Sequence, residues 1–183
     1  MALSILLAVA CGGRLPPPKR RVIESDIEGW TFARYQKSVD VEVYVPENTG
    51  VAHAASYRLE EAARRGVITD ADVVNAIVTE YERRDGVEVA VIRFARRLAQ
   101  ESGYTVDESK VGGQRVFRVG GHGEAWAFWS SGRYVVKIGG RGRERIPGEV
   151  IEEYGRRYPS AVKRGALDEP LPEEDEPPKK AQQ

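Results

Sequence analysis

The chain has 183 residues, of which 41% are hydrophobic and 31% are charged, values typical of a globular protein of one domain. Its 28 basic and 28 acidic residues give a formal net charge of zero, so the composition provides no electrostatic reason to expect nucleic-acid binding. The single cysteine excludes an intrachain disulfide. One cysteine and two histidines are also too few for a zinc finger or an iron–sulfur cluster, and we expect neither metal nor cofactor.

The first feature along the chain is an apolar run at residues 2–10, which only Ser4 interrupts. The run ends at the sole cysteine, Cys11, which two glycines follow. This pattern resembles the signal peptide and lipobox of a bacterial lipoprotein. In that family the cysteine thiol receives a diacylglyceryl group, and cleavage leaves the modified cysteine as the new amino terminus. The resemblance implies a signal peptide at residues 1–10 and lipidation of Cys11.

The two ends of the remaining chain differ in composition from its middle. Residues 11–21 contain three consecutive prolines and four basic side chains, which predict an extended, lipid-anchored tether. Residues 163–183 combine prolines with acidic side chains and have little to bury, which predicts a disordered tail. Residues 22–162 are left as a single folded domain.

The first predicted element of the domain is a strand at Val39–Val45, where valines alternate with polar residues until Pro46. The preceding segment, with Trp30, Phe32 and Tyr35, does not reveal its type. Residues 52–65 place apolar side chains along one side and glutamates four residues before arginines, which predicts a helix.

A second helix is predicted after Thr69, which is suited to cap it, and ends at the Asp85–Gly86 pair. The next segment, 87–94, is ambiguous because its valines alternate as in a strand while Val91, Phe94 and the residues after them fit a helical stripe. The density of β-branched side chains favours a strand that leads into a helix ending near Gly103.

From Tyr104 onward, glycine-containing turns separate short runs rich in valine and aromatic residues. This pattern predicts three hairpins that join four strands. Pro147 then opens a helix whose glutamates at 152 and 153 can pair with Arg156 and Arg157. The sum is an α+β fold in which helices pack on an antiparallel sheet that includes a C-terminal meander of about four strands.

The hairpin at residues 124–139 carries the first candidate binding residues, Trp126 and Phe128. If Ser131 and Gly132 are the central turn residues, Trp129 opposes Tyr134, and Trp126 and Phe128 point to the other side of the sheet. A three-residue turn would shift the register by one and bring Trp126 and Phe128 towards the core. On the outer side, the aromatic pair would need a helix, a partner or a ligand to cover it.

Motifs of known chemistry are absent from the sequence: it has no phosphate-binding loop, no dinucleotide fingerprint and no serine elbow. His122 lies among glycines, where it is either a turn residue or an exposed catalytic base. Arg141, Arg143 and Arg145 crowd a glycine-containing loop, which is either solvated or a site for an anionic ligand such as a phosphate, a carboxylate or a sulfated sugar.

These features predict a lipid-anchored protein on the outer-membrane or periplasmic face of a bacterial envelope, acting as a non-enzymatic binding or assembly module. Its expected partners are the membrane, through the lipid on Cys11, and an envelope protein or anionic ligand. One alternative is a cytosolic interaction domain whose residues 5–9 form a buried strand that only mimics a signal peptide. Another is a small envelope hydrolase or carbohydrate-binding enzyme that uses His122 or the arginine loop.

Overall fold

The computed structural model describes residues 15–38 and 40–171. The predicted signal peptide and Cys11 lie outside the described residues. The elements in chain order are β1 (Trp30–Ser38), β2 (Gly50–Leu59), α1 (Glu60–Arg65), the 3₁₀ helix η1 (Asp70–Asp72), β3 (Val73–Tyr81), α2 (Val87–Gln100), β4 (Tyr104–Val111), β5 (Gln114–Gly121), β6 (Glu124–Ser131), β7 (Tyr134–Arg141) and α3 (Gly148–Arg157). None of the helices in this part of the chain has the length and apolar character needed to cross a membrane.

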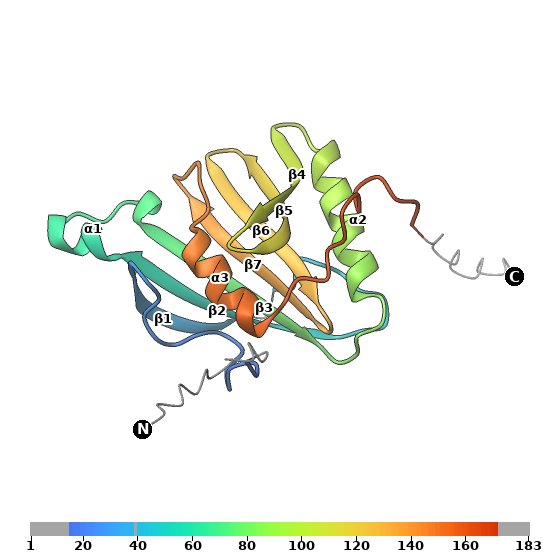
Figure 1. Ribbon diagram of the computed structural model, residues 1–183, viewed down its shortest axis with the longest axis horizontal. Helices are drawn as coiled ribbons and strands as arrows, with labels where there is room; N and C mark the ends of the chain where they lie inside the picture. Colours follow the sequence, from blue (N-terminus) through green and yellow to red (C-terminus); the bar gives the residue numbers. More distant parts are fainter. Residues whose placement is uncertain (1–14, 39, 172–183) are drawn as a thin grey trace, which may run out of the picture.

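The strands form one antiparallel sheet in the order β1-β2-β3-β7-β6-β5-β4 (Figure 1). It consists of two meanders, β1–β3 and β4–β7, which pair with each other along β3 and β7. The predicted α+β class and C-terminal meander are confirmed. The sheet has seven strands, however, because three strands precede that meander.

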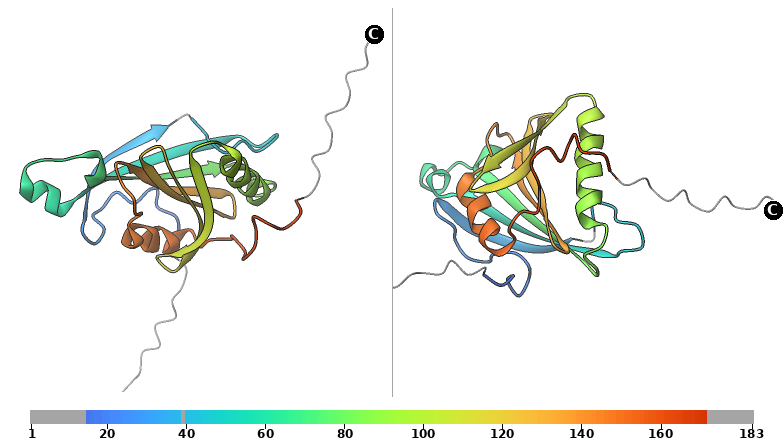
Figure 2. Two further views of the ribbon diagram at one scale, coloured as in Figure 1. Left: turned by 90° about the horizontal axis from the view of Figure 1, so that it is seen from above. Right: turned by 45° about the vertical axis from the view of Figure 1, so that its right-hand side comes forward.

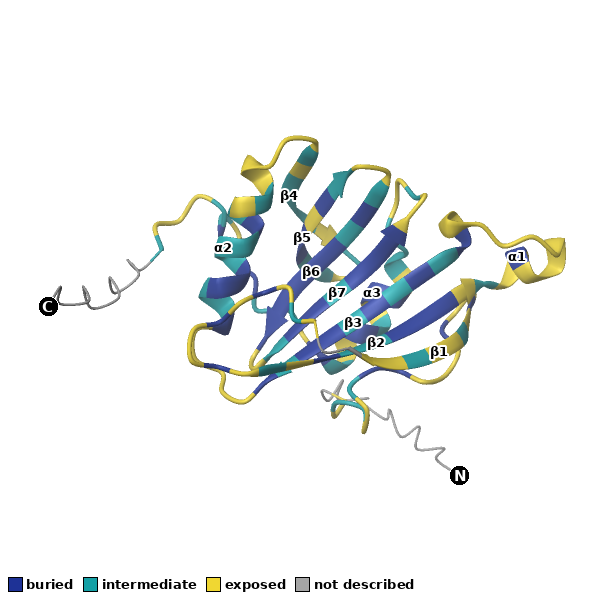
Figure 3. Ribbon diagram, turned by 180° about the vertical axis from the view of Figure 1, so that it is seen from behind, coloured by how far each residue is buried: buried dark blue, intermediate teal, exposed yellow. Residues whose placement is uncertain are grey.

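The two faces of the sheet are covered by different elements (Figure 2). On one face, which we call the α3 face, Trp129 Nε1 donates a hydrogen bond to the carbonyl oxygen of Tyr158 at 2.7 Å, directly after α3. On the other, the α2 face, Phe94 packs edge-on against Phe128 with ring centroids 5.3 Å apart. Figure 3 views this second face, where α2 lies over one end of the sheet and no helix lies in front of β1, β2 or β3.

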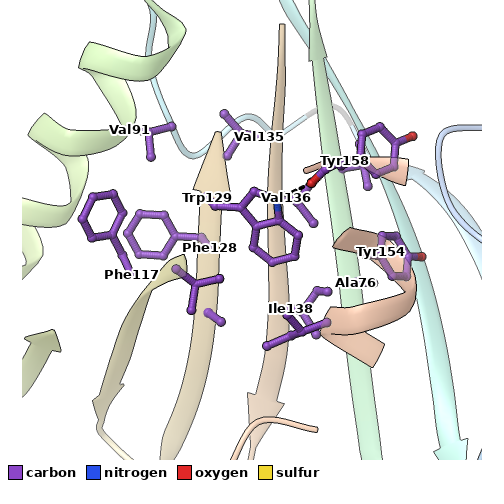
Figure 4. Packing of buried hydrophobic residues seen from close by; sticks show 14 of the residues in the cluster. Ala76, Val91, Phe117, Phe128, Trp129, Val135, Val136, Ile138, Tyr154 and Tyr158 are labelled. Carbon is purple, nitrogen blue, oxygen red and sulfur yellow. Dashed lines mark hydrogen bonds between the residues drawn. The ribbon is translucent and has the colours of Figure 1, made fainter. Parts of the chain in front are cut away.

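Buried side chains cover both faces of the sheet, and each face contains aromatic rings (Figure 4). Trp129 and Ile138 are fully buried on the α3 face, and Phe117 and Phe128 are buried on the α2 face. Because β6 contributes buried side chains to both faces, its alternating positions separate a core under α3 from a core under α2.

The strand predicted at Val39–Val45 is wrong: residues 40–45 form a loop, and Val39 lies outside the described residues. The first strand is instead β1, in the segment whose type the sequence left open. Val43 and Val45 are buried, as the alternation suggested. Their burial does not come from strand pairing. The loop that carries them folds across the end of the sheet, where Tyr81 donates a hydrogen bond to the Val43 carbonyl at 2.5 Å.

Two predicted helices are also wrong. Most of the segment 52–65 belongs to β2, and only its last six residues form a helix, α1. The segment after Thr69 forms η1 and then β3. Both strands lie inside the sheet and pair with a neighbour on each side. The energy of this pairing outweighs the helix propensity of their alanines and the helix-like spacing of their apolar residues.

Residues 87–94, predicted as a strand, are the first half of α2, whose end at Gln100 agrees with the predicted stop near Gly103. The buried side chains of α2 are Val87, Ala90, Val91 and Ala95, which are spaced by three and four residues. This helical spacing decides between the two patterns in the sequence.

The C-terminal half follows the prediction more closely. The three hairpins and α3 are present, and α3 begins after Pro147. The central residues of the last turn are Gly132 and Arg133, so Trp129 opposes Val136 and not Tyr134. This is a shift of two positions, which preserves the predicted separation of Trp126 and Phe128 from Trp129 onto opposite faces.

The described residues beyond 22–162 also pack on the domain. The Leu15 N–H donates to the carbonyl of Arg156 at 3.3 Å, and Arg21 pairs with Glu80 at 2.5 Å. After α3, Glu108 accepts hydrogen bonds from two backbone N–H groups, those of residues 165 and 167, each at 2.8 Å. The folded body therefore includes the end of the predicted tether and the start of the predicted tail.

Candidate functional site

The α2 face contains a hollow of about 230 Å³ where the loop at 40–45, α2 and the strands β3, β6 and β7 meet. Its apolar walls are formed by Val43, Ile77, Phe94, Phe128 and Val135. Polar groups stand at its rim, and they are Asp40, Glu42, Thr79 and Lys137. We call this the apolar hollow.

The chain that closes one side of the apolar hollow is held by hydrogen bonds to the end of β3 and to the residues that follow it. Tyr81 binds the carbonyl of Val43, as described above. Asn48 donates to the carbonyl oxygens of Arg83 at 2.9 Å and Asp85 at 3.2 Å, and it accepts a hydrogen bond from the Arg83 N–H. These contacts fix Val43 as a wall of a preformed site.

Lys137 is the central polar residue of the rim. Its Nζ lies 2.6 and 2.8 Å from the two carboxylate oxygens of Glu42. The same ammonium lies 4.2 Å from the centroid of the Trp126 ring, a cation–π geometry. Trp126 lies opposite Gly139, where an added Cβ would come within 2.9 Å of the indole, so the glycine leaves room for the ring.

A second, more polar hollow of about 440 Å³ adjoins the first and shares Glu42 and Lys137 with it. Asn75, Trp126 and Arg141 also line it. Arg141 stands opposite Glu124 in the register of β6 and β7, and the Glu124 carboxylate accepts a hydrogen bond from the Tyr104 hydroxyl at 3.0 Å. The two hollows together form one site that is apolar at one end and polar at the other.

The structure brings three of the predicted candidate residues together at this site. Phe128 lines the apolar hollow, and Trp126 and Arg141 line the polar one. Arg143 lies instead over the ring of Trp30, 5.1 Å from its centroid, and donates a hydrogen bond to the Ala71 carbonyl. Burial lowers the pKa of the Arg143 guanidinium.

Arg145 is exposed, and neither Arg143 nor Arg145 lines the two hollows. The arginine loop thus does not form the single anion cradle that its sequence suggested. Only Arg141 contributes to the site.

His122 is a turn residue with φ +49°. Its Nε2 lies 3.1 Å from the Ser102 carbonyl, and its ring packs against Tyr104 with centroids 4.7 Å apart. His53, on the α3 face, shares a hydrogen bond with the Tyr35 hydroxyl at 2.8 Å, and burial lowers its pKa. Within the described chain, a carbonyl and a phenol are thus the hydrogen-bond partners of the two histidines. This arrangement lacks the carboxylate–histidine–nucleophile chain of a hydrolase.

Metal ligation has no support in residues 15–38 and 40–171, where no three His, Cys, Asp or Glu side chains meet in a suitable cluster. The sequence prediction did not name the other residues that line the two hollows, among them Glu42, Ile77, Phe94 and Lys137. The signal for Lys137 was present, because a hairpin turn at Gly132–Arg133 places it directly opposite Phe128.

Comparison with known proteins adds no assignment. No protein-family model matches the chain, and neither the curated proteins nor the solved structures contain a significant match.

Proposed function

We propose that this chain is a lipid-anchored bacterial envelope protein that acts as a non-enzymatic binding module, with the apolar hollow as its binding site. The resemblance of its first residues to a lipoprotein signal supports the anchor. The observation that carries the binding role is a preformed apolar site with a few polar groups at its rim, the usual character of a ligand site. The contacts of His122 and His53 give no support to the alternative of a hydrolase.

The size of the apolar hollow limits what it takes. Its volume of about 230 Å³ lies below the range of about 300–1,000 Å³ for pockets that enclose drug-sized ligands. A single acyl chain, or one aromatic or aliphatic side chain of a partner protein, fits this space. The site is therefore suited to an apolar group that belongs to a larger molecule.

The binding role is tested with N-phenyl-1-naphthylamine, a neutral apolar dye that fluoresces when it leaves water and whose phenyl ring has the size of the single aromatic group that fits the hollow. We expect saturable binding to the protein and loss of binding in the variant Ile77→Trp, because Ile77 is a half-buried wall residue and the larger ring fills the hollow. The matched control is Val51→Trp, which adds a similar volume at a position 37% exposed on the α3 face. Equal binding by both variants would place the dye elsewhere.

The anchor is tested by metabolic labelling with an alkyne fatty acid in a bacterial host. The wild-type chain should carry the label, and Cys11→Ser should not, because the thiol is the acceptor for the diacylglyceryl group. Label on both proteins, or on neither, would contradict lipidation at Cys11.

A further inference from the structure

The ion pair between Lys137 and Glu42 indicates the chemical class of the ligand. On the basis of the proposed binding role, we infer that the site takes an amphipathic anion: an apolar chain enters the apolar hollow, and a carboxylate replaces that of Glu42 on Lys137. The inference rests on where the two charges lie, how exposed each of them is, and what surrounds them.

Lys137 is the part of the pair that belongs to the rigid body of the protein. It is a residue of the central strand β7, its side chain is 20% exposed, and its ammonium lies against the Trp126 ring. An ammonium held in such a partly dry place needs a negative partner. Any occupant of the site must therefore keep Glu42 on Lys137 or supply an anion in its place.

Glu42 is the replaceable part. It lies in the loop at 40–45, outside the strand pairings, and its side chain is 46% exposed. Its carboxylate can turn into solvent without loss of a backbone hydrogen bond of the sheet. A carboxylate returned to water recovers its hydration, so the exchange costs little when a second carboxylate binds Lys137.

The loop itself presents the chemistry that we assign to the ligand. Glu42 places a carboxylate on Lys137, and the next residue, Val43, places an apolar side chain in the wall of the hollow. A carboxylate beside an apolar group thus already occupies this part of the site. An external ligand with the same two groups would extend the apolar contact to Ile77 and Phe94.

The position of Lys137 sets how such a ligand lies. The residue lines both hollows, so an anionic head on Lys137 is in the polar hollow while its chain points into the apolar one. The other basic side chain of the lining, Arg141, lies opposite Glu124 in the register of β6 and β7. Lys137 forms its ion pair with a carboxylate that comes from a loop and not from the sheet.

The inference is tested by displacement of bound N-phenyl-1-naphthylamine with three ligands of equal chain length: octanoate, octan-1-ol and octylamine. We expect octanoate to bind at least about tenfold more tightly than the other two, because a hydrogen bond to a charged group is stronger than one between neutral groups. Lys137→Met should reduce octanoate to the affinity of octan-1-ol. Lys37→Met, on the exposed α3 side of β1, is the matched control and should leave all three affinities unchanged.

Removal of the Glu42 carboxylate, which competes with the ligand for Lys137, should strengthen octanoate binding. Glu42→Gln should bind octanoate several-fold more tightly than the wild type, since the ligand no longer displaces a carboxylate. Glu47→Gln also changes a glutamate between β1 and β2, but it lines neither hollow and should have no effect. Circular dichroism on each variant confirms that it is folded.

The outcomes separate this inference from the proposed function. The dye could bind while the three ligands show equal affinities or octylamine binds best. Either result would overturn the anionic class of ligand and leave the binding role intact. Unchanged or weaker octanoate binding in Glu42→Gln would overturn the exchange at Lys137. Absence of dye binding to the wild type would contradict the binding role itself.

Discussion

At the scale of single residues, a buried group of hydroxyl and backbone groups joins the sheet, α3 and the N-terminal segment. The Tyr57 hydroxyl donates to the carbonyl of Ile23 at 2.5 Å. Because that donation uses its only proton, the Tyr154 hydroxyl must donate to Tyr57, 2.8 Å away, while it accepts from the Ile23 N–H at 3.1 Å. Each polar group of this Tyr57–Tyr154–Ile23 cluster is thereby satisfied in a dry place.

Tyr154→Phe should destabilise the protein, because it leaves the Ile23 N–H and one side of the Tyr57 hydroxyl without a partner. We expect a loss of about 1–3 kcal/mol in the free energy of unfolding, measured by urea denaturation. Tyr44→Phe removes the hydroxyl of a residue that is 77% exposed and should change stability by less than about 0.5 kcal/mol. A comparable loss in both variants would refute the role assigned to the cluster.

The same burial makes stability depend on alkaline pH. Burial raises the pKa of Tyr57, Tyr81, Tyr154 and Tyr158. In the unfolded chain tyrosine ionises near pH 10, so above that pH the unfolded state loses protons that the folded state retains. The tyrosine contribution is complete below about pH 10 and is lost as the pH rises further.

This dependence is measured as the free energy of unfolding across the alkaline range, with phenolate absorbance followed in parallel. The decline above about pH 10 should be shallower in Tyr154→Phe than in the wild type, because one buried tyrosine fewer is linked to unfolding. Equal slopes in the two proteins would show that Tyr154 ionises equally in both states.

At the scale of elements, the sequence predicts best those elements whose conformation is determined by residues close together in the chain. The hairpins of the C-terminal meander were recognisable because their turns need glycines, and the β4–β5 turn has positive φ at both Gly112 (+52°) and Gly113 (+75°). The strands β2 and β3 were mistaken for helices because their neighbours in the sheet come from distant parts of the chain. The three alanines in β2 are good helix formers, and the segment is a strand because it pairs with a neighbouring strand on each side.

The β4–β5 turn also provides a test of packing against α3. A Cβ at Gly112 would lie 2.4 Å from the Gly148 carbonyl and 2.7 Å from the Glu152 nitrogen, whereas one at Gly113 would meet nothing within 4 Å. Gly113→Ala should cost about 1–2 kcal/mol from its positive φ alone. Gly112→Ala should cost at least about 1 kcal/mol more, because the backbone at the start of α3 must move. Thermal denaturation of the two variants measures the difference, and equal costs would mean that the turn does not contact the helix in solution.

At the scale of the whole molecule, the binding site is assembled from parts that sequence patterns treat separately. Trp126, Phe128 and Arg141 were candidates because they lie on one predicted hairpin. Ile77, Phe94 and Glu42 come from a strand, a helix and a loop that each had been assigned a different structure. Since the hollow exists only where these elements meet, the correct hairpin alone could supply only part of its lining.

The proposed lipid anchor also implies an orientation of the folded domain relative to the membrane. The described chain starts at Leu15, whose N–H binds the Arg156 carbonyl near the end of α3. Cys11 is four residues earlier, so an extended connection spans at most about 14 Å. A lipid on Cys11 would therefore hold the end of α3 close to the bilayer. The apolar hollow, on the opposite face of the sheet, would face away from the membrane.

This orientation can be measured with spin labels on the lipidated protein in phospholipid vesicles that contain a nickel-chelating lipid. In the lipidated protein the proposed acyl group blocks the thiol of Cys11, the sole cysteine of the sequence, so an introduced cysteine supplies the free thiol for labelling. Nickel at the bilayer surface speeds the electron-spin relaxation of nearby labels. The spin label at Arg156→Cys should therefore relax faster than the one at Tyr44→Cys, which lies in the loop on the α2 face. A flexible insertion of ten residues after Gly13 should diminish the difference, since the short connection causes the orientation. Faster relaxation at residue 44 would reverse the assignment, whereas protein that fails to float with the vesicles would contradict the anchor.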